Sequence, residues 1–103
     1  MMFSARSVAR TMEFQREQQH WMVIQLRRSI DDFERLAADL DLAIRAEEER
    51  THNFDPTHVA YSMLAATTRL RRDKIQRSCD ELKVQLQKLH ASIEDGRVYA
   101  EVA

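Results

Sequence analysis

Two groups of residues in this chain invite a search for metal binding or proton transfer. His52, Asp55 and His58 lie within a seven-residue stretch, but they flank a predicted turn and match no zinc or di-metal spacing. We therefore expect them to cap a helix, face solvent or contact a partner. His20 and His90 come from opposite ends of the two predicted helices, and no acid or nucleophile is arranged around them for a catalytic dyad. The sequence thus predicts no catalytic residue and no metal site.

Cys79 is the single cysteine, so no disulfide can form within the chain. Its spacing from apolar neighbours predicts a buried position, where a thiol behaves as a small hydrophobic group rather than as a nucleophile. One free thiol fits a reducing cytoplasm. The sequence also lacks a glycine-rich phosphate loop and the spacing of a catalytic triad. We expect a protein that is not an enzyme and that needs no cofactor.

The most concentrated charge in the sequence is a basic run. One interpretation is a docking patch for an acidic protein surface; nucleic acid is a weaker candidate, because no interleaved aromatic residues or binding motif accompany the run. The other interpretation is internal pairing, with Asp73 on the same helix or with acids on the other. The run consists of the candidate partner-binding residues Arg69, Arg71, Arg72, Lys74 and Arg77, and the acids expected opposite it are Asp31, Asp32, Glu34, Asp39 and Asp41.

The near absence of helix-breaking residues predicts the elements that hold these side chains. The 103 residues include one glycine and one proline, the residue types that most often end helices. We predict an all-α fold, a single antiparallel two-helix coiled-coil hairpin, with helix one at about 5–50, a turn at about 51–55 and helix two at about 56–95. Gly96 is suited to closing helix two, which would leave a loose tail over 96–103.

Apolar residues recur at alternating steps of three and four along both predicted helices, the spacing that lets one helix lie along another. In helix two the pattern changes phase across residues 71–74, which predicts a locally altered supercoil. Antiparallel folding places Ile30 near Cys79, with an error of about one helical turn. The predicted core seam consists of Val23, Leu26, Ile30, Phe33, Leu40, Ile44, Met63, Leu70, Ile75, Cys79, Leu82, Leu86 and Leu89.

The start of helix two is predicted from turn chemistry. Asp55 can accept hydrogen bonds from the first free amides of the helix, and Pro56 suits its first position. Phe54 and Val59 are spaced to form a hydrophobic staple across that start.

Two apolar groups extend beyond a narrow seam. Trp21 with Met22 lies near the outer end of the rod, and Tyr61 lies near the turn with Met63 and Leu64. Each group is either a set of exposed anchors for a partner or part of a wider core. The net charge of −1 gives no general attraction to nucleic acid or anionic lipid, and the longest aliphatic or aromatic run, residues 21–24, is far shorter than the roughly 20 residues of a membrane-spanning helix.

A family resemblance is carried by residues between Asp32 and Leu82. They are Asp32-Phe33-Glu34-Arg35, Ala37-Ala38-Asp39-Leu40-Asp41, Glu47-Glu48-Glu49-Arg50, Asp55-Pro56, His58, Ala60-Tyr61, Arg71-Arg72-Asp73, Arg77-Ser78 and Asp80-Glu81-Leu82. With these residues the chain resembles the FliJ family of flagellar type III export proteins in its alphaproteobacterial form. Members of that family usually continue well beyond the point where this sequence stops.

The resemblance implies a non-enzymatic coiled-coil adaptor, stalk or chaperone of the flagellar protein export apparatus. It implies a cytoplasmic protein, peripheral at the cytoplasmic face of the flagellar base. Its partners would be the flagellar export ATPase, the export gate, and export substrates or their chaperones, and the ATP chemistry would belong to the ATPase. The alternative is a self-associating structural protein, a homodimer that forms a four-helix bundle and has no export role.

Overall fold

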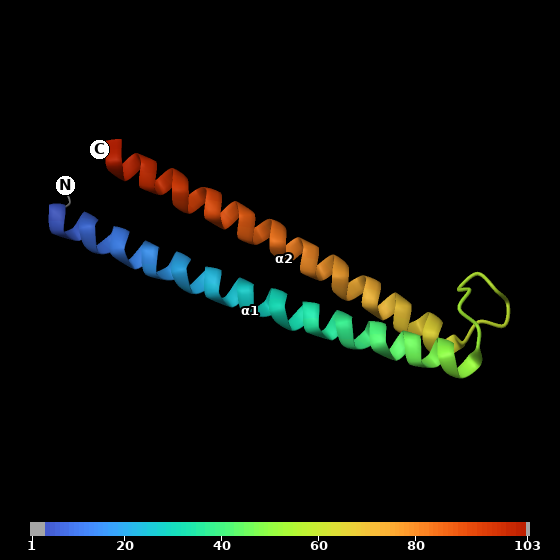
Figure 1. The fold of residues 1–103 in the computed structure, drawn as a ribbon. Helices are drawn as coiled ribbons and strands as arrows, with labels where there is room; N and C mark the ends of the chain where they lie inside the picture. The colour runs from blue at the N-terminus through green and yellow to red at the C-terminus, as the bar shows by residue number, and fades with distance from the viewer. Residues whose placement is uncertain (1–3, 103) are drawn as a thin grey trace.

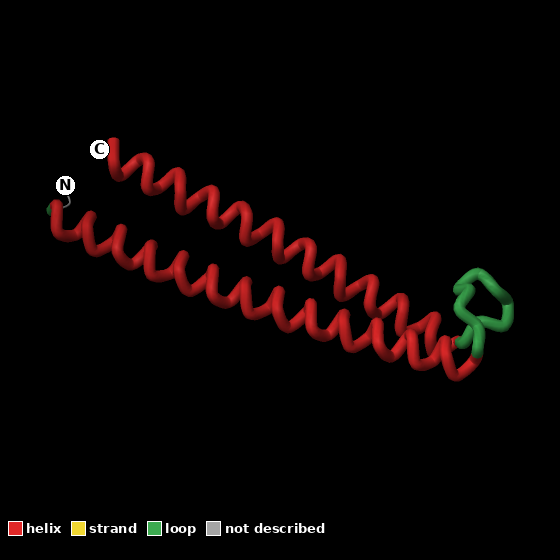
Figure 2. Tube along the Cα trace, in the orientation of Figure 1, coloured by secondary structure: helices red, strands yellow, loops and turns green. Residues whose placement is uncertain are grey.

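The computed structural model describes the backbone of residues 4–102 and the side chains of residues 4–96. The protein is an antiparallel hairpin of two long helices, α1 (Ala5–Thr51) and α2 (Met63–Val102), joined by a loop over residues 52–62 (Figures 1 and 2). This confirms the predicted all-α hairpin. The rod measures 73 × 22 × 17 Å and has a radius of gyration of 22.4 Å, against about 13 Å for a compact domain of similar length. Neither described helix has a stretch long and apolar enough to cross a membrane.

Local hydrogen bonds close both ends of α1. Ser4 precedes the first turn in an extended conformation, and its Oγ accepts a hydrogen bond from the Ser7 amide at 3.2 Å, which satisfies one of the free amides of a helix N-terminus. His52 adopts the left-handed conformation, with φ 53° and ψ 28°, and its amide donates to the Glu49 carbonyl. Both boundaries of α1 lie close to the predicted ones.

The predicted start of helix two at residue 56 is wrong, because α2 begins at Met63. The Asp55 carboxylate accepts hydrogen bonds from the amide and the hydroxyl of Thr57, so it closes a short turn inside the loop instead of capping a helix. Ser62 supplies the cap, since its Oγ accepts a hydrogen bond from the Ala65 amide at 3.2 Å.

Three further predictions about helix two are wrong. Pro56 lies in the loop, and Phe54 and Val59 are both exposed, the latter completely, so they form no staple. Gly96 lies inside α2, which continues to Val102 through most of the predicted loose tail. A glycine costs a helix interior about 1 kcal/mol relative to alanine, so it weakens a long helix without ending it.

The core is a narrow seam between the two helices. In α1 the buried apolar side chains are Ile30, Ala37 and Ile44, and in α2 they are Ala65 and Cys79. Met63 and Leu70 were predicted in the seam, and this is wrong, because they are 82% and 65% exposed. The remaining predicted seam residues are half-buried: Val23, Leu26, Phe33, Leu40, Ile75, Leu82, Leu86 and Leu89.

The predicted change of phase in α2 is absent. Ala65 is completely buried, and Thr68, Arg72 and Ile75 are half-buried, so the alternation of three and four continues unbroken from Ala65 to Cys79. Two seam positions in this stretch carry polar residues, so the spacing of apolar residues in the sequence does not reveal the repeat of seam positions. Met63 and Leu70 belong to the outer face of the same regular helix.

The helices pair as predicted in their middle and separate toward the termini. Cys79 Sγ lies 3.9 Å from the carbonyl oxygen of Ile30, which confirms the expected pair. Farther from the loop the ribbons diverge (Figure 1), and a groove of about 800 Å³ opens between them, lined on one side by Met12 and Val23 and on the other by Ile93.

Candidate functional site at the hairpin tip

The loop that joins the helices is held by its own hydrogen bonds. Asn53 Oδ1 accepts from the Asp55 amide at 3.1 Å, and Asp55 Oδ1 accepts from the Thr57 amide at 2.9 Å. The Asp55 carbonyl accepts from the His58 amide at 3.1 Å, and the His58 carbonyl accepts from the Tyr61 amide at 3.0 Å. Each bond spans two or three residues, the pattern of successive tight turns. The loop is therefore a folded element with a defined shape.

Asp55 and His58 use their side chains for hydrogen bonds inside the loop. Hydrogen bonds from the hydroxyl and the amide of Thr57 lower the pKa of the Asp55 carboxyl. His58 Nδ1 accepts a hydrogen bond from the Ala60 amide at 3.0 Å, so the proton of the neutral imidazole lies on Nε2. Within the described part of the chain, no three His, Cys, Asp or Glu side chains gather at metal-binding distance.

A buried polar network joins α1, the loop and α2 at the base of the loop. Glu48 is 6% exposed, and its Oε2 accepts hydrogen bonds from the Tyr61 hydroxyl at 2.9 Å and from Arg69 Nη2 at 3.1 Å. Arg69 Nε also donates to the Tyr61 oxygen at 2.8 Å. Each member thus bonds to both others, which satisfies the requirement that a buried charge be paired and hydrogen-bonded. We call Glu48, Tyr61 and Arg69 the clamp.

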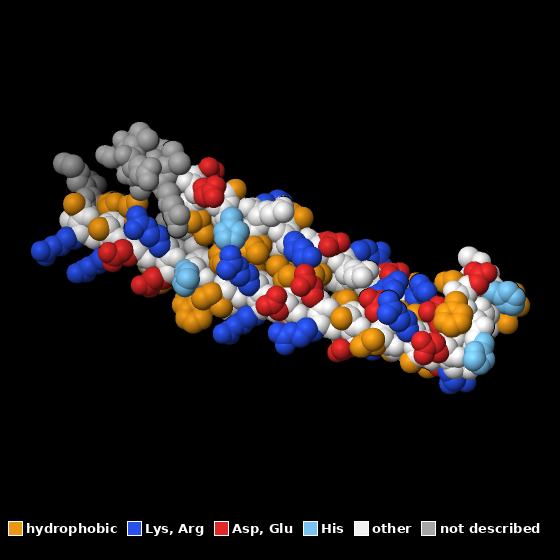
Figure 3. All heavy atoms as spheres, in the orientation of Figure 1, with side chains coloured by type: hydrophobic (Ala, Val, Ile, Leu, Met, Phe, Trp, Pro, Cys, Tyr) orange, Lys and Arg blue, Asp and Glu red, His pale blue; other side chains and the backbone are white. Residues whose placement is uncertain are grey.

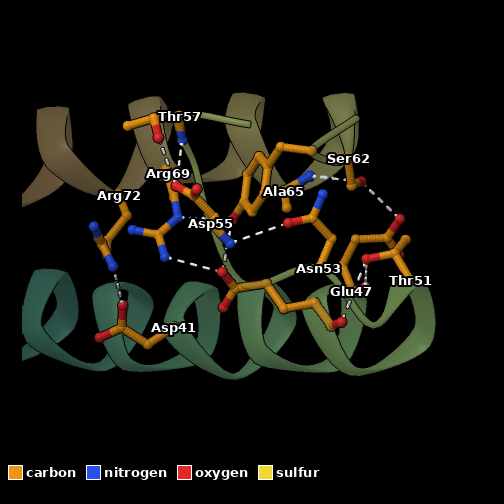
Figure 4. A network of polar contacts seen from close by, with 12 residues as sticks. Asp41, Glu47, Thr51, Asn53, Asp55, Thr57, Ser62, Ala65, Arg69 and Arg72 are labelled. Atoms are coloured by element: carbon orange, nitrogen blue, oxygen red, sulfur yellow. Dashed lines mark hydrogen bonds and ion pairs between the residues drawn. The ribbon is translucent and has the colours of Figure 1, made fainter. Parts of the chain in front are cut away.

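A second carboxylate ties the loop to α1 beside the clamp. Glu47 Oε1 accepts a hydrogen bond from Ser62 Oγ at 2.8 Å (Figure 4), and both carboxylate oxygens accept from Arg50. The bonds from Arg50 and then from Ser62 lower the pKa of Glu47 from 4.5 to about 2. Burial raises the pKa of Glu48, but the hydrogen bonds from the other clamp residues outweigh this, so the pKa is lowered. Both carboxylates are therefore ionised at neutral pH.

Large apolar side chains remain in solvent around this network. Phe54 and Val59 of the loop are 59% and 102% exposed, and Met63 and Leu64 of the first turn of α2 are 82% and 63% exposed. We call these four residues the tip surface. Tyr61 was predicted as a partner-binding residue of the same group, but it is only 9% exposed, because its hydroxyl is bonded between charged groups of both helices.

The basic run divides between internal pairing and solvent. Arg69 belongs to the clamp, and Arg72 bonds Asp41 of α1 at 2.8 Å and Asp73 at 3.2 Å (Figure 4). Because Asp73 is bonded to Arg72, the pair expected between Asp73 and Arg77 is absent. Three exposed members of the run form no ion pair within 4 Å among the described residues: Arg71, Lys74 and Arg77.

The acids of α1 are likewise used only in part. Asp41 bonds the basic run as predicted, whereas Glu34 bonds Lys83 at 3.0 Å. Three exposed acids form no ion pair within 4 Å in the described chain: Asp31, Asp32 and Asp39. Exposed pairs of this kind contribute about 0–1 kcal/mol each, so their main effect is to fix the register of the two helices.

The other predicted anchors lie at the open end of the rod. Trp21 and Met22 are 60% and 50% exposed, and Met22 lines a small groove of about 440 Å³ together with Leu26 and Leu89. His20 and His90 both line the larger groove between the separating helices.

Sequence reasoning missed the clamp, although a signal for it exists. Glu48 falls on the buried side of α1, four residues past Ile44, the last apolar residue of the seam, and a carboxylate there requires a cation and a donor. Arg69 on the facing helix and Tyr61 in the loop are residues of those two types.

Comparison with known proteins adds no relative: no family model, curated protein or solved structure matches this chain.

Proposed function

We propose that this protein is a non-enzymatic adaptor that binds other proteins through the tip surface at one end of a rigid rod. The observation that supports this is that the loop is held by hydrogen bonds and also exposes large apolar side chains to solvent. Two antiparallel helices can be joined by about 2–5 residues, whereas this loop runs over residues 52–62 and is fastened by a buried carboxylate. Loop residues beyond those needed to reverse the chain, held in one shape, suit recognition.

We further propose that the partners belong to the flagellar protein export apparatus. This rests on the resemblance to FliJ, whose least generic residues here are Asp55, Pro56, His58 and Tyr61, all in the loop that carries the tip surface. The export ATPase, the export gate, and export substrates or their chaperones are the candidate partners. In this proposal the rod is a stalk or chaperone at the cytoplasmic face of the flagellar base.

The alternative function is a structural protein that self-associates and has no export role. The seam residues are already covered by the facing helix, so self-association would use the outer faces. Large apolar side chains exposed on the outer face of α1 favour this candidate.

The export proposal is tested by capture of purified export ATPase on the full chain, together with motility of a strain that lacks the gene. The double variant Phe54→Ser with Val59→Ser removes half of the tip surface without touching the clamp. Val84→Ser, which is 47% exposed in the middle of α2, is the matched control. We expect the tip variant to lose capture and motility and the control to keep both. Normal motility of the deletion strain would reject the export setting, and unchanged capture by the tip variant would reject the tip as the binding surface.

A further inference from the structure

Three of the six large apolar side chains exposed on α1 lie at separations of seven or its multiples, on the side opposite the seam. Phe14, Trp21 and Leu42 are 60%, 60% and 64% exposed, and their separations are multiples of seven. In a two-helix coiled coil with its seam at Val23, Leu26 and Ile30, this is the heptad position farthest from the facing helix, where polar residues are the norm. Figure 3 shows apolar side chains interspersed with charged ones along the surface of the rod. The outer face of α1 therefore carries a second stripe that nothing in the hairpin covers.

The same heptad position carries Arg28 and Arg35 between the apolar residues, with acids beside them. Arg28, Arg35, Asp32 and Asp39 are all exposed, and none forms an ion pair within 4 Å in the part of the chain that the structure describes. Salt bridges elsewhere already use Glu34 and Asp41 of the same helix. The outer face of α1 is thus a stripe of large apolar residues and uncommitted charges of both signs.

We propose that this outer face binds the same face of a second copy of the chain in antiparallel orientation, giving a two-fold symmetric dimer. The argument is charge complementarity. A register that sets Arg35 opposite Asp32 of the second copy also sets Arg28 opposite its Asp39. The two-fold axis then repeats both pairs in the reverse sense, as an isologous interface requires. Four complementary pairs form from charges that the single hairpin leaves unused.

Two of the three apolar residues of the stripe face α1 of the second copy at that same register, while Phe14 faces position 53, beyond the end of α1. Trp21 lies opposite Ala46 and next to Arg45 of the second copy, where an arginine can stack on the indole face, and Leu42 lies opposite Gln25 and next to Ile24. At this register Glu17 faces Arg50 of the second copy, whereas Glu49 faces Gln18 and has Glu17 as a like-charged neighbour. A parallel arrangement is disfavoured, because it would set Arg28 against Arg28 and Asp32 against Asp32.

The dimer would leave both tip surfaces free. Because the two rods run in opposite directions, their loops would point to opposite ends of the assembly, and the paired stretch of α1, from Arg16 to Thr51, would extend over about 50 Å at 1.5 Å per residue. The inference does not depend on the export proposal. The proposed dimer is a rod that carries one tip surface at each end.

Charge reversal with rescue tests the interface on the full chain. The double variant Arg28→Glu with Arg35→Glu makes the centre of the stripe uniformly acidic, and Asp32→Lys with Asp39→Lys makes it uniformly basic. By sedimentation equilibrium at low salt we expect a dimer for the unaltered chain, dimerisation weakened about tenfold or more in each variant, and a one-to-one heterodimer on mixing the two. The control Asp80→Lys with Glu81→Lys, two exposed acids of α2, should leave the dimer intact.

Trp21 provides a second readout, since it is the single tryptophan of the chain. Its fluorescence should shift to the red as the unaltered protein is diluted, and the two variants should show the red-shifted emission at all concentrations. An unaltered chain that stays monomeric at high micromolar concentration would overturn the proposal. So would a dimer that survives in either charge-reversed variant, a mixture of the variants that fails to associate, or a control that dissociates.

Discussion

Replacing Tyr61 by phenylalanine tests whether the clamp stabilises the hairpin. The substitution keeps the ring, which is 9% exposed, and removes the hydroxyl that donates to Glu48 and accepts from Arg69. Hydrogen bonds to charged groups contribute about 1.5–3 kcal/mol each. Glu48 keeps its bond from Arg69, whose side chain is 30% exposed and can turn to water. We therefore expect a loss of about 2 kcal/mol, somewhat less than two full bonds.

The assay is urea and thermal unfolding followed by circular dichroism at one protein concentration, since dimerisation would make the midpoint depend on concentration. A loss of about 2 kcal/mol corresponds to roughly 8–16 °C for a domain of this size. Thr67→Val is the matched control, because it removes an exposed hydroxyl that bonds only within α2, and it should change stability by less than about 0.5 kcal/mol. If Tyr61→Phe behaves like this control, the clamp does not hold the tip. Combining Tyr61→Phe with Arg69→Met should cost less than the sum of the single losses, as in any shared network.

Two other predictions concern ionisable groups at the tip and in the seam. The pKa of Glu47 is about 2 in the folded protein and 4.5 ordinarily, so the unfolded chain binds a proton first as the pH falls. The melting temperature should therefore decline between about pH 4.5 and 2. A Glu47→Gln variant whose melting temperature declines just as steeply would show that this carboxylate is not responsible. Cys79 is 5% exposed, so its thiol should react with an aromatic disulfide reagent far more slowly in the folded protein than in urea, and equal rates would place it outside the seam.

The sequence predicts the middle of the rod well because that part is determined by apolar spacing alone. Ile30, Ile44 and Cys79 are buried at positions given by the alternation of three and four. The same method failed in the first turns of α2, where Thr68 and Arg72 occupy seam positions. The apolar pattern instead pointed to Met63 and Leu70, which are one heptad apart but lie on the outer face of α2. Periodicity identifies a stripe, and only the facing helix decides which stripe is the seam.

The start of α2 could not be predicted from the sequence for a different reason. Asp55 and Pro56 form a sound local signal for a helix start, yet the carboxylate has an equally good partner two residues away in Thr57. The choice between these two local structures is made by distant contacts, since Glu48 must reach Tyr61 and Arg69. An α2 that began at residue 56 would carry Tyr61 in its second turn rather than in the loop that reaches back to α1.

The two ends of the rod differ in how many contacts hold the helices together, and this difference bears on where a partner would bind. In the described chain no large side chain is completely buried, so the seam supplies only a modest hydrophobic contribution per residue, and the helices separate toward their termini. The clamp adds a buried ion pair and its hydrogen bonds at the loop end, so the tip is held by polar contacts as well as by the seam. A partner that covered the tip surface would gain from a shape already fixed and would lose little conformational entropy in the loop. A partner that covered the open end would instead have to order helices that touch each other little there, and its binding would be measured largely as added stability of the rod.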